Sequence, residues 1–245
     1  MRVVSWEGGS VTARSSVAVS HSVTGAKLRD SYLEAVSTLT FGIARVRDGA
    51  IVIGPLTLLR FGTPKITRTS VDWPIEGGLL ARRPGGHWRL QASGGLVQAT
   101  VTGYTPRLPR LLYQVTHLQV HQLFTRLYLL SLRGRDPLPG LPATPDARFR
   151  AGTVDVAVCL TLTGFPRRLR LRRTLLLLAA YHAACWSVSG RTLGGLVMGQ
   201  RVVAVDGSRI TPAQSMLRLA LIPLSWLTGR PIHDKIAGTE VIADS

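Results

Sequence analysis

Charged residues within or beside apolar stretches of the second half of the chain are the best candidates for chemistry. Arg148 and Asp155 are seven residues apart, or two helical turns, so on a helix their side chains lie on one face. An ionised carboxylate in hydrocarbon costs roughly 2.5–3.5 kcal/mol and is normally placed toward a partner or water. Asp155 therefore needs a partner. The sequence offers it Arg148, His182, Arg218 and the group His233, Asp234 and Lys235.

Two roles are open for a charge network that includes Arg148, Asp155, His233 and Asp234. In the first role, the ion pairs hold helices together and no ion is moved. In the second role, the buried carboxylate is a proton or cation site, because ionisable groups inside a membrane often mark transport pathways.

Other patterns that suggest catalysis or metal binding are incomplete. His117 and His121 have the i, i+4 spacing that places two imidazoles on one helix face, but no third ligand accompanies them. Asp72 and Glu76 have no His or Cys pattern nearby, which favours salt bridges with arginine over acid–base catalysis. A nucleophile elbow and a Walker-type phosphate loop are both missing from the sequence. We predict no enzyme activity, no catalytic residue, no cofactor and no metal site.

The composition combines high positive charge with many apolar residues. The 245 residues carry a formal net charge of +17, and 45% of them are hydrophobic. Such charge occurs in nucleic-acid binders, in proteins held at anionic membrane surfaces and in membrane proteins with basic flanks. The high hydropathy favours the last two classes. Cys159 and Cys185 both lie in apolar stretches and are expected to be buried thiols, because two cysteines are too few for a disulfide framework or a zinc site.

The first half of the chain predicts an α+β domain over residues 28–134. Residues 1–27 lack the continuous apolar core of a signal peptide and are interpreted as a disordered leader. A helix is expected at 28–37. Between 40 and 104, short runs rich in Val, Ile, Leu and Thr are punctuated by Gly and Pro, which predicts a β-meander of four to six strands.

The segment after Pro109 predicts one long helix, with Gly134 as its stop, because leucines and valines recur there near the helical period. A strand meander followed by a long helix distantly resembles the helix-grip lipid-cavity domains of the START type. That resemblance implies an apolar ligand held between the sheet and the helix.

A proline-rich linker over residues 135–147 separates this domain from the rest of the chain. Beyond it, at 148–245, an all-α membrane domain of about three short helices is predicted. Its apolar segments cover 151–165, 174–190 and 212–229. Each is at or just under the roughly 18–20 residues that a helix needs to cross a bilayer core of about 30 Å, so length alone leaves a membrane span open.

Residues 148–242 resemble the RDD family of small membrane domains. A first pattern, R-x-x-A-x-x-x-D, is matched by Arg148, Ala151 and Asp155. A glycine-rich loop that ends in G-x-R-V-V is matched by Gly190, Thr192, Gly194, Gly199, Arg201, Val202 and Val203. A last pattern, H-D-x-x-A-G-T, is matched by His233, Asp234, Ala237, Gly238 and Thr239. The resemblance adds Arg201 to the candidate charge network, and the loop departs from the family at Gly195, where a lysine is common.

The resemblance implies an integral, multi-pass protein of the bacterial cell membrane with an undefined activity: solute or ion transport, or a membrane-anchoring accessory role. The implied partners are the lipid bilayer and its anionic headgroups, together with a second copy of the chain or another membrane protein. Nucleic acid is disfavoured because the arginines are spread along the chain. Two alternatives stay open: a peripheral arginine-rich binder of anionic lipid or nucleic acid, and an apolar-ligand-binding N-terminal domain anchored by the tail.

Overall fold

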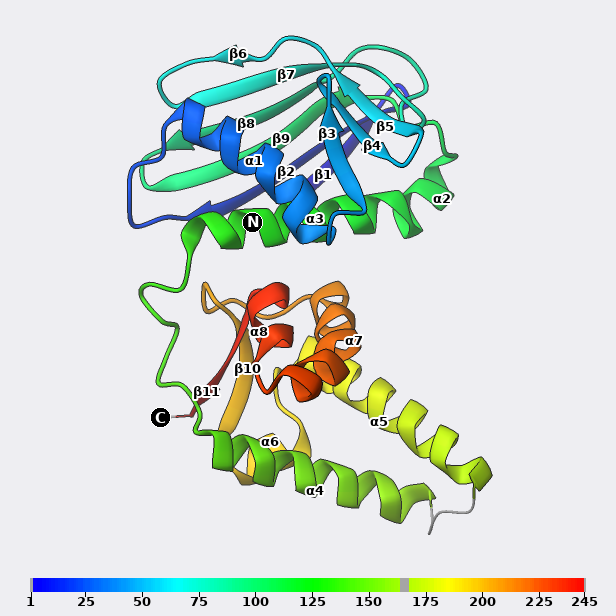
Figure 1. Ribbon diagram of the computed structural model, residues 1–245, viewed down its shortest axis with the longest axis vertical. Coiled ribbons are helices and arrows are strands. Elements are labelled where there is room, and N and C mark those ends of the chain that lie inside the picture. The colour runs from blue at the N-terminus through cyan, green and yellow to red at the C-terminus, as the bar shows by residue number, and fades with distance from the viewer. Residues whose placement is uncertain (1, 164–167, 245) are drawn as a thin grey trace. The chain divides into compact units, whose positions relative to one another are not determined.

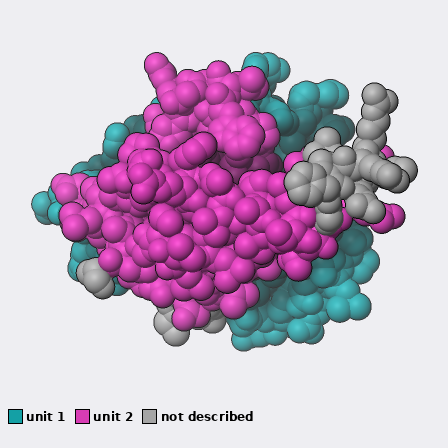
Figure 2. Space-filling view, turned by 90° about the horizontal axis from the view of Figure 1, so that it is seen from below, with its two compact units in different colours: residues 1–134 teal, residues 135–245 magenta. Residues whose placement is uncertain are grey.

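The computed structural model describes residues 2–163 and 168–244. The chain divides into two compact units, Met1–Gly134 (unit 1) and Arg135–Ser245 (unit 2), which Figure 2 shows in different colours. Unit 1 contains an antiparallel sheet with helices, and unit 2 consists mainly of helices. The end of the first predicted apolar segment, at 164–165, lies outside the described residues.

Unit 1 is built on an antiparallel sheet with the strand order β1-β2-β9-β8-β7-β5-β4-β3, and β6 pairs with β7 (Figure 1). The predicted meander holds seven strands rather than four to six, because the ladder is divided into shorter strands than the sequence pattern suggested. The strands are β1 Arg2–Glu7, β2 Ser10–Ala18, β3 Ala44–Arg47, β4 Ala50–Ile53, β5 Leu56–Phe61, β6 Lys65–Ile66, β7 Ser70–Gly77, β8 His87–Ser93 and β9 Leu96–Tyr104.

The prediction of a disordered leader at residues 1–27 is wrong. Strand β1 pairs with β2, and β2 pairs in turn with β9, so this segment extends the sheet. Burial of one face of β2 stabilises this pairing: Val11, Ala13 and Val17 are buried, and the serines between them are not. This is the period-2 pattern of a strand with one buried face.

Helix α1 (Gly25–Leu39) starts earlier than the predicted 28–37, because the side chain of Thr24 caps it by accepting a hydrogen bond from the Lys27 amide. The close approach of the chain explains Gly25: a Cβ there would meet Thr67 O at 2.2 Å. The predicted long helix is divided into α2 (Arg110–Val115) and α3 (His117–Arg133), because Thr116 departs from helical geometry with φ −121° and ψ −84°. Gly134 ends α3 as predicted.

Helices α1 and α3 pack on each other and on the sheet (Figure 1). Aromatic rings lie between them and the sheet. Tyr32 of α1 lies 5.4 Å from Trp73 and 5.6 Å from Trp88, measured between ring centroids. Phe124 and Tyr128 of α3 meet the same ring edge to face. The region between sheet and helix, where the START resemblance implies a lipid cavity, is therefore occupied by side chains.

Unit 2 is not all-α, which corrects the predicted fold class. Strands β10 and β11 form an antiparallel pair, in which Val202 lies opposite Val241. The partners are about forty residues apart in sequence and each is only five residues long, so the helical segments dominated the sequence pattern. The elements are α4 Pro145–Thr163, α5 Arg168–Val188, α6 Leu193–Val197, β10 Gln200–Ala204, α7 Pro212–Thr228, α8 Ile232–Ala237 and β11 Thr239–Ala243.

The proline-rich segment between the units is tied to the last strand. The Ala143 amide donates to Val241 O at 2.9 Å, and the Ala243 amide donates to Leu141 O at 2.8 Å. Helix α4 then begins at Pro145, inside the predicted linker at 135–147.

Over residues 2–163 and 168–244, no helix combines the length and the apolar character needed to cross a membrane. The multi-pass arrangement stays a prediction.

Candidate functional site

The centre of unit 2 is a buried network of arginines and carboxylates around Asp234. Helix α8 places Asp234 between two other helices, and its side chain is only 3% exposed. Arg148 of α4 reaches its Oδ2 with Nη1 at 3.2 Å, and Arg218 of α7 places Nε 3.0 Å from its Oδ1. The Thr239 hydroxyl donates to Oδ1 at 2.7 Å. One carboxylate thus joins α4, α7, α8 and β11.

A second carboxylate, Glu240 on β11, extends this network. Arg148 donates to Glu240 Oε1 from Nη2 at 3.2 Å, and Arg135 forms an ion pair with the other oxygen. Arg135 also donates to the backbone carbonyl of Asp234 at 3.1 Å. Three guanidinium groups therefore face two carboxylates, and the network carries a net positive charge.

Arg218 is the most deeply buried arginine of the network, with only 4% of the residue exposed to solvent. Its guanidinium lies over the ring of Trp186, 4.4 Å from the centroid, which is a cation–π contact. Its Nε makes the ion pair with Asp234 without hydrogen-bond geometry, and its Nη1 has no hydrogen-bond partner among the described residues. Leaving one such donor unpaired costs about 1–3 kcal/mol or more, so the ion pair and the ring must offset that cost.

The carboxyl group of Asp234 and the imidazole of His233, both on α8, are expected to differ in charge near pH 7. Burial opposes ionisation of Asp234, but the neighbouring cations, Arg218 first among them, and the hydroxyl of Thr239 hold its pKa below the ordinary value. Burial lowers the pKa of His233, and the charge of Asp234 offsets this only in part. We therefore expect a carboxylate at Asp234 and a neutral imidazole at His233 near pH 7. The imidazole Nδ1 lies 2.7 Å from the hydroxyl of Ser225.

Asp155 forms a separate cluster further along α4. Its Oδ1 accepts hydrogen bonds from the Tyr181 hydroxyl at 2.9 Å and from the Gly194 amide at 2.8 Å, and its Oδ2 lies 3.4 Å from His182 Nε2. Burial opposes ionisation of Asp155. Hydrogen bonding from His182, from the Gly194 amide and from the Tyr181 hydroxyl nevertheless holds its pKa below the ordinary value. The amide contact requires close packing, because a Cβ on Gly194 would meet Ala151 O at 2.0 Å.

Aromatic rings connect the two clusters. The His182 ring meets Trp186 edge to face with 4.9 Å between centroids, and Trp186 supports Arg218 from its face. A continuous series of contacts therefore runs from Asp155 through His182, Trp186 and Arg218 to Asp234.

Three of the five predicted network residues lie together: Arg148, His233 and Asp234. Asp155 does not join them, although it shares α4 with Arg148, and its partner is His182, one of the candidates that the sequence offered. Arg201 lies apart as well, because it pairs with Asp244 at 3.4 Å near the end of the β10–β11 pair.

Sequence reasoning missed Arg135, Glu240, Tyr181 and Trp186. Two of them had a weak signal: Arg135 lies at the start of the segment interpreted as a linker, and Glu240 follows the last family-like pattern directly. Of the cysteines predicted to be buried, Cys159 is buried and Cys185 is half-buried.

The histidine and carboxylate pairs of unit 1 have ordinary structural surroundings. The His117 ring contacts Tyr104 and Tyr113, and the His121 ring contacts Trp88. Asp72 pairs with His87 at 2.8 Å and, as the sequence predicted, with an arginine. That arginine is Arg89, at 3.3 Å.

Unit 2 is thus a small helical unit with charged groups in its interior and a two-stranded sheet that holds its ends together. Comparison with known families assigns its central part: residues 170–237 match the model of the RDD family, which confirms the resemblance for the C-terminal region. The match covers α5 to α8 and leaves Arg148 and Asp155 outside it. No curated protein and no solved structure matches the chain.

Proposed function

We propose that the protein is a membrane-associated protein of the RDD type, in which unit 2 contacts the bilayer with its apolar helix surfaces and encloses its charged residues. The observation that carries this proposal is the distribution of side chains in unit 2. All four buried charged residues of the described chain belong to this unit: Asp155, Arg218, Asp234 and Glu240.

The exterior of the same helices is apolar to an extent that water does not favour. Trp226 is 83% exposed and Leu227 is 85% exposed. Exposed apolar surface costs about 25 cal/mol per Å², and contiguous patches of this kind mark membrane or protein contacts. Other strongly exposed apolar side chains are Phe149 and Leu162 on α4 and Leu176 and Val188 on α5.

The ion pairs suit a structural role in this setting. Asp234 and Glu240 hold helices that come from distant parts of the sequence, and each carboxylate accepts from more than one donor. In a medium without water, such internal pairing is needed because unpaired polar groups cost several kcal/mol each. The proposed activity is therefore that of a membrane anchor or accessory unit for unit 1. Arg191 and Arg201 share one carboxylate, Asp244, so the pair keeps an excess positive charge for anionic headgroups.

Membrane fractionation tests this proposal. The full-length chain is expressed, the membranes are washed with high salt or alkaline carbonate, and the pellet is analysed. An anchored protein stays in the pellet after both washes, whereas release by salt alone would support the peripheral alternative. A chain that is freely soluble and monomeric without detergent would contradict the proposal.

A second candidate function, proton or cation movement, is supported by the surroundings of Asp155. Its Oδ2 lies 3.4 Å from His182 Nε2, and carboxylate and imidazole groups are the side chains that form proton relays in membrane proteins. Purified protein in liposomes would then give a proton-coupled flux that is lost in Asp155→Asn and kept in Asp244→Asn, a matched change at a partly exposed ion pair. Equal flux in the three proteins would exclude this function for Asp155.

A further inference from the structure

Unit 1 contains a concave site whose charged side chains have no assigned role. It has a volume of about 560 Å³ and lies where the β1–β2 turn meets the loop after β7 and the segment that follows β9. Arg82, Arg83 and Arg110 line it, and no carboxylate does. Within the described part of the chain, none of the three arginines forms an ion pair with an acidic residue.

The backbone around this cationic pocket is fixed by hydrogen bonds. The Arg82 amide donates to Thr105 O at 2.9 Å, and the Arg107 amide donates to Leu80 O at 3.0 Å. The Tyr104 hydroxyl donates to the same carbonyl at 2.6 Å. The loop that carries Arg82 and Arg83 is therefore attached to the segment that leads to Arg110, so the arginines are held near each other before any ligand binds.

Arg110 is held in addition by an aromatic ring. Its guanidinium lies 5.2 Å from the centroid of Trp6, and Trp6 meets Tyr113 edge to face at 5.4 Å. A guanidinium stacked on an indole keeps its in-plane N–H groups available for an anion. Gly8 and Gly9 also line the pocket, and their positive φ angles of 55° and 82° form a tight turn that brings no side chain into it.

We propose that the cationic pocket binds a phosphate monoester group. Three guanidinium groups from two segments supply more charge and more donors than a carboxylate with two oxygens can use. A phosphate monoester has three terminal oxygens and about two negative charges near neutral pH, and arginine binds such oxygens in a bidentate way. The group could belong to a small soluble molecule or to a lipid headgroup, because the pocket is open to solvent on one side.

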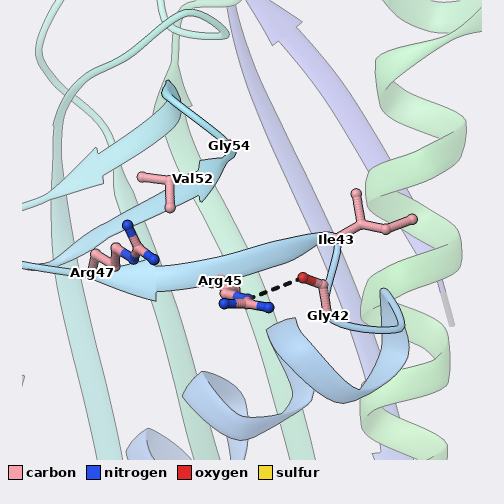
Figure 3. Close-up of a pocket in the computed structure, with 6 residues that line it drawn as sticks. All are labelled: Gly42, Ile43, Arg45, Arg47, Val52 and Gly54. Atoms are coloured by element: carbon pink, nitrogen blue, oxygen red, sulfur yellow. Dashed lines mark hydrogen bonds between the residues drawn. The ribbon is translucent and has the colours of Figure 1, made fainter.

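A second cationic groove in unit 1 provides a matched control. Arg45 and Arg47 of β3 line it together with Val52 of β4 and Gly54, which follows β4, as Figure 3 shows. It has two arginines instead of three, no aromatic ring, and Arg45 already donates from Nε to Gly42 O at 3.2 Å. Its arginines test whether the positive charge of the unit alone explains binding.

The experiment titrates the purified full-length protein with glycerol 3-phosphate in a calorimeter, with glycerol as the uncharged control. A parallel arm measures binding to phosphatidylcholine vesicles with and without phosphatidic acid. The proteins compared are the wild type, R82Q/R83Q, R110K and R45Q/R47Q, each checked for an unchanged unfolding temperature. R110K keeps the charge but loses the stacked, bidentate guanidinium.

R82Q/R83Q is expected to weaken binding by at least about tenfold, since hydrogen bonds to charged groups are individually strong. R110K should weaken it less, and R45Q/R47Q should leave it within about twofold. Binding of the soluble ester that R82Q/R83Q weakens identifies a soluble ligand, and binding of phosphatidic acid vesicles alone that R82Q/R83Q weakens identifies a headgroup; either result supports the site. Absence of both, or equal losses in R45Q/R47Q and R82Q/R83Q, would overturn it.

Discussion

The two units of this protein bury opposite kinds of side chain. Unit 1 packs aromatic and aliphatic residues such as Tyr32, Trp88 and Leu90 between a sheet and two helices, and none of its described charged residues is buried. Unit 2 buries one arginine, Arg218, and three carboxylates and exposes Trp226 and Leu227. Unit 1 also exposes apolar side chains, among them Leu111 and Val115 on α2, but the polar residues that it buries, Ser70, Thr100 and Thr125, are uncharged.

This difference is the one expected if unit 1 lies in water and unit 2, as proposed, contacts lipid. A domain in water gains free energy by burying apolar surface, so its charged groups stay outside. A unit in contact with lipid has no such gain, and its stability must come from close packing and internal polar pairs. Gly194 against Ala151 and Asp234 against Arg218 are contacts of these two kinds.

The largest expected effect tests the buried network of unit 2. Asp234→Asn leaves Arg218 and Arg148 without their shared charge, and breaking a buried ion pair costs about 3–5 kcal/mol. Asp244→Asn, at the partly exposed pairs with Arg191 and Arg201, should cost about 1 kcal/mol or less. Chemical denaturation of the protein in detergent measures both. Equal losses would show that the interior of unit 2 does not depend on its ion pairs.

The next effect concerns a titratable group inside unit 1. Burial, followed by the charge of His117, lowers the pKa of His121 from 6.5 to about 4. The unfolded chain therefore takes up a proton that the folded unit does not, and the free energy of unfolding falls as the pH drops from about 6.5 to about 4. The full loss is about 3 kcal/mol. Hydrogen exchange of β8 and β9 amides across this range reports it.

His121→Phe is the matching variant, because it keeps a ring against Trp88 and removes the titration. Its stability should fall less than that of the wild type between pH 6.5 and pH 4. If both proteins lose the same free energy, unit 1 does not require a neutral group at this position.

A pair of glycines tests the packing of α4 in unit 2. Gly194→Ala should destabilise the protein by about 1–3 kcal/mol, because its Cβ would overlap Ala151 O and displace the amide that donates to Asp155. Gly152→Ala, on α4 itself but facing open space, should be neutral or stabilising by about 0.5–1 kcal/mol. Thermal unfolding in detergent compares the two variants. A loss of stability in Gly152→Ala as large as that in Gly194→Ala would contradict a special role for close packing at Gly194.

The smallest expected effect on folding belongs to the exposed face of α7. W226S/L227S should leave stability within about 0.5 kcal/mol, as surface changes usually do, yet lower vesicle binding by about tenfold or more. Leu111→Ser on α2 of unit 1, a residue 77% exposed, serves as the control and should leave vesicle binding unchanged. Flotation with lipid vesicles measures binding. Equal vesicle binding by the wild type and both variants would show that the exposed apolar side chains of α7 do not mediate lipid contact.

For unit 1, the sequence was enough to predict the kinds of element but not all of their limits. Asp48-Gly49 and Gly134 are local signals: an Asp-Gly pair favours a hairpin turn, and β3 and β4 pair across it, while α3 ends at Gly134 as predicted. The pairing of β2 with β9 links residues 78 (Ala18 with Leu96) to 93 (Val11 with Tyr104) positions apart, which no local signal encodes. The first strands were missed because serines and glycines masked their alternation.

For the charge network, the sequence indicated which residues take part better than it indicated which residues pair with each other. Arg148, His233 and Asp234 meet as expected, since their residue types require neutralisation inside an apolar unit. Asp155 was expected to need company, but which of the candidates supplies it depends on how α5 packs beside α4, and that geometry places His182 there. Glu240 required the β10–β11 pair, which the helical pattern had hidden.

The pairing of β11 with both β10 and the segment before α4 has a consequence for synthesis of the chain. Thr239 and Glu240 emerge from the ribosome after all the helices of unit 2, yet they supply the hydroxyl to Asp234 and the second carboxylate to Arg148. During translation, the helices therefore exist for a time with cations that lack part of their counter-charge. A nascent chain halted before Thr239 would leave unit 2 open at both ends and exposed to chaperones or proteases.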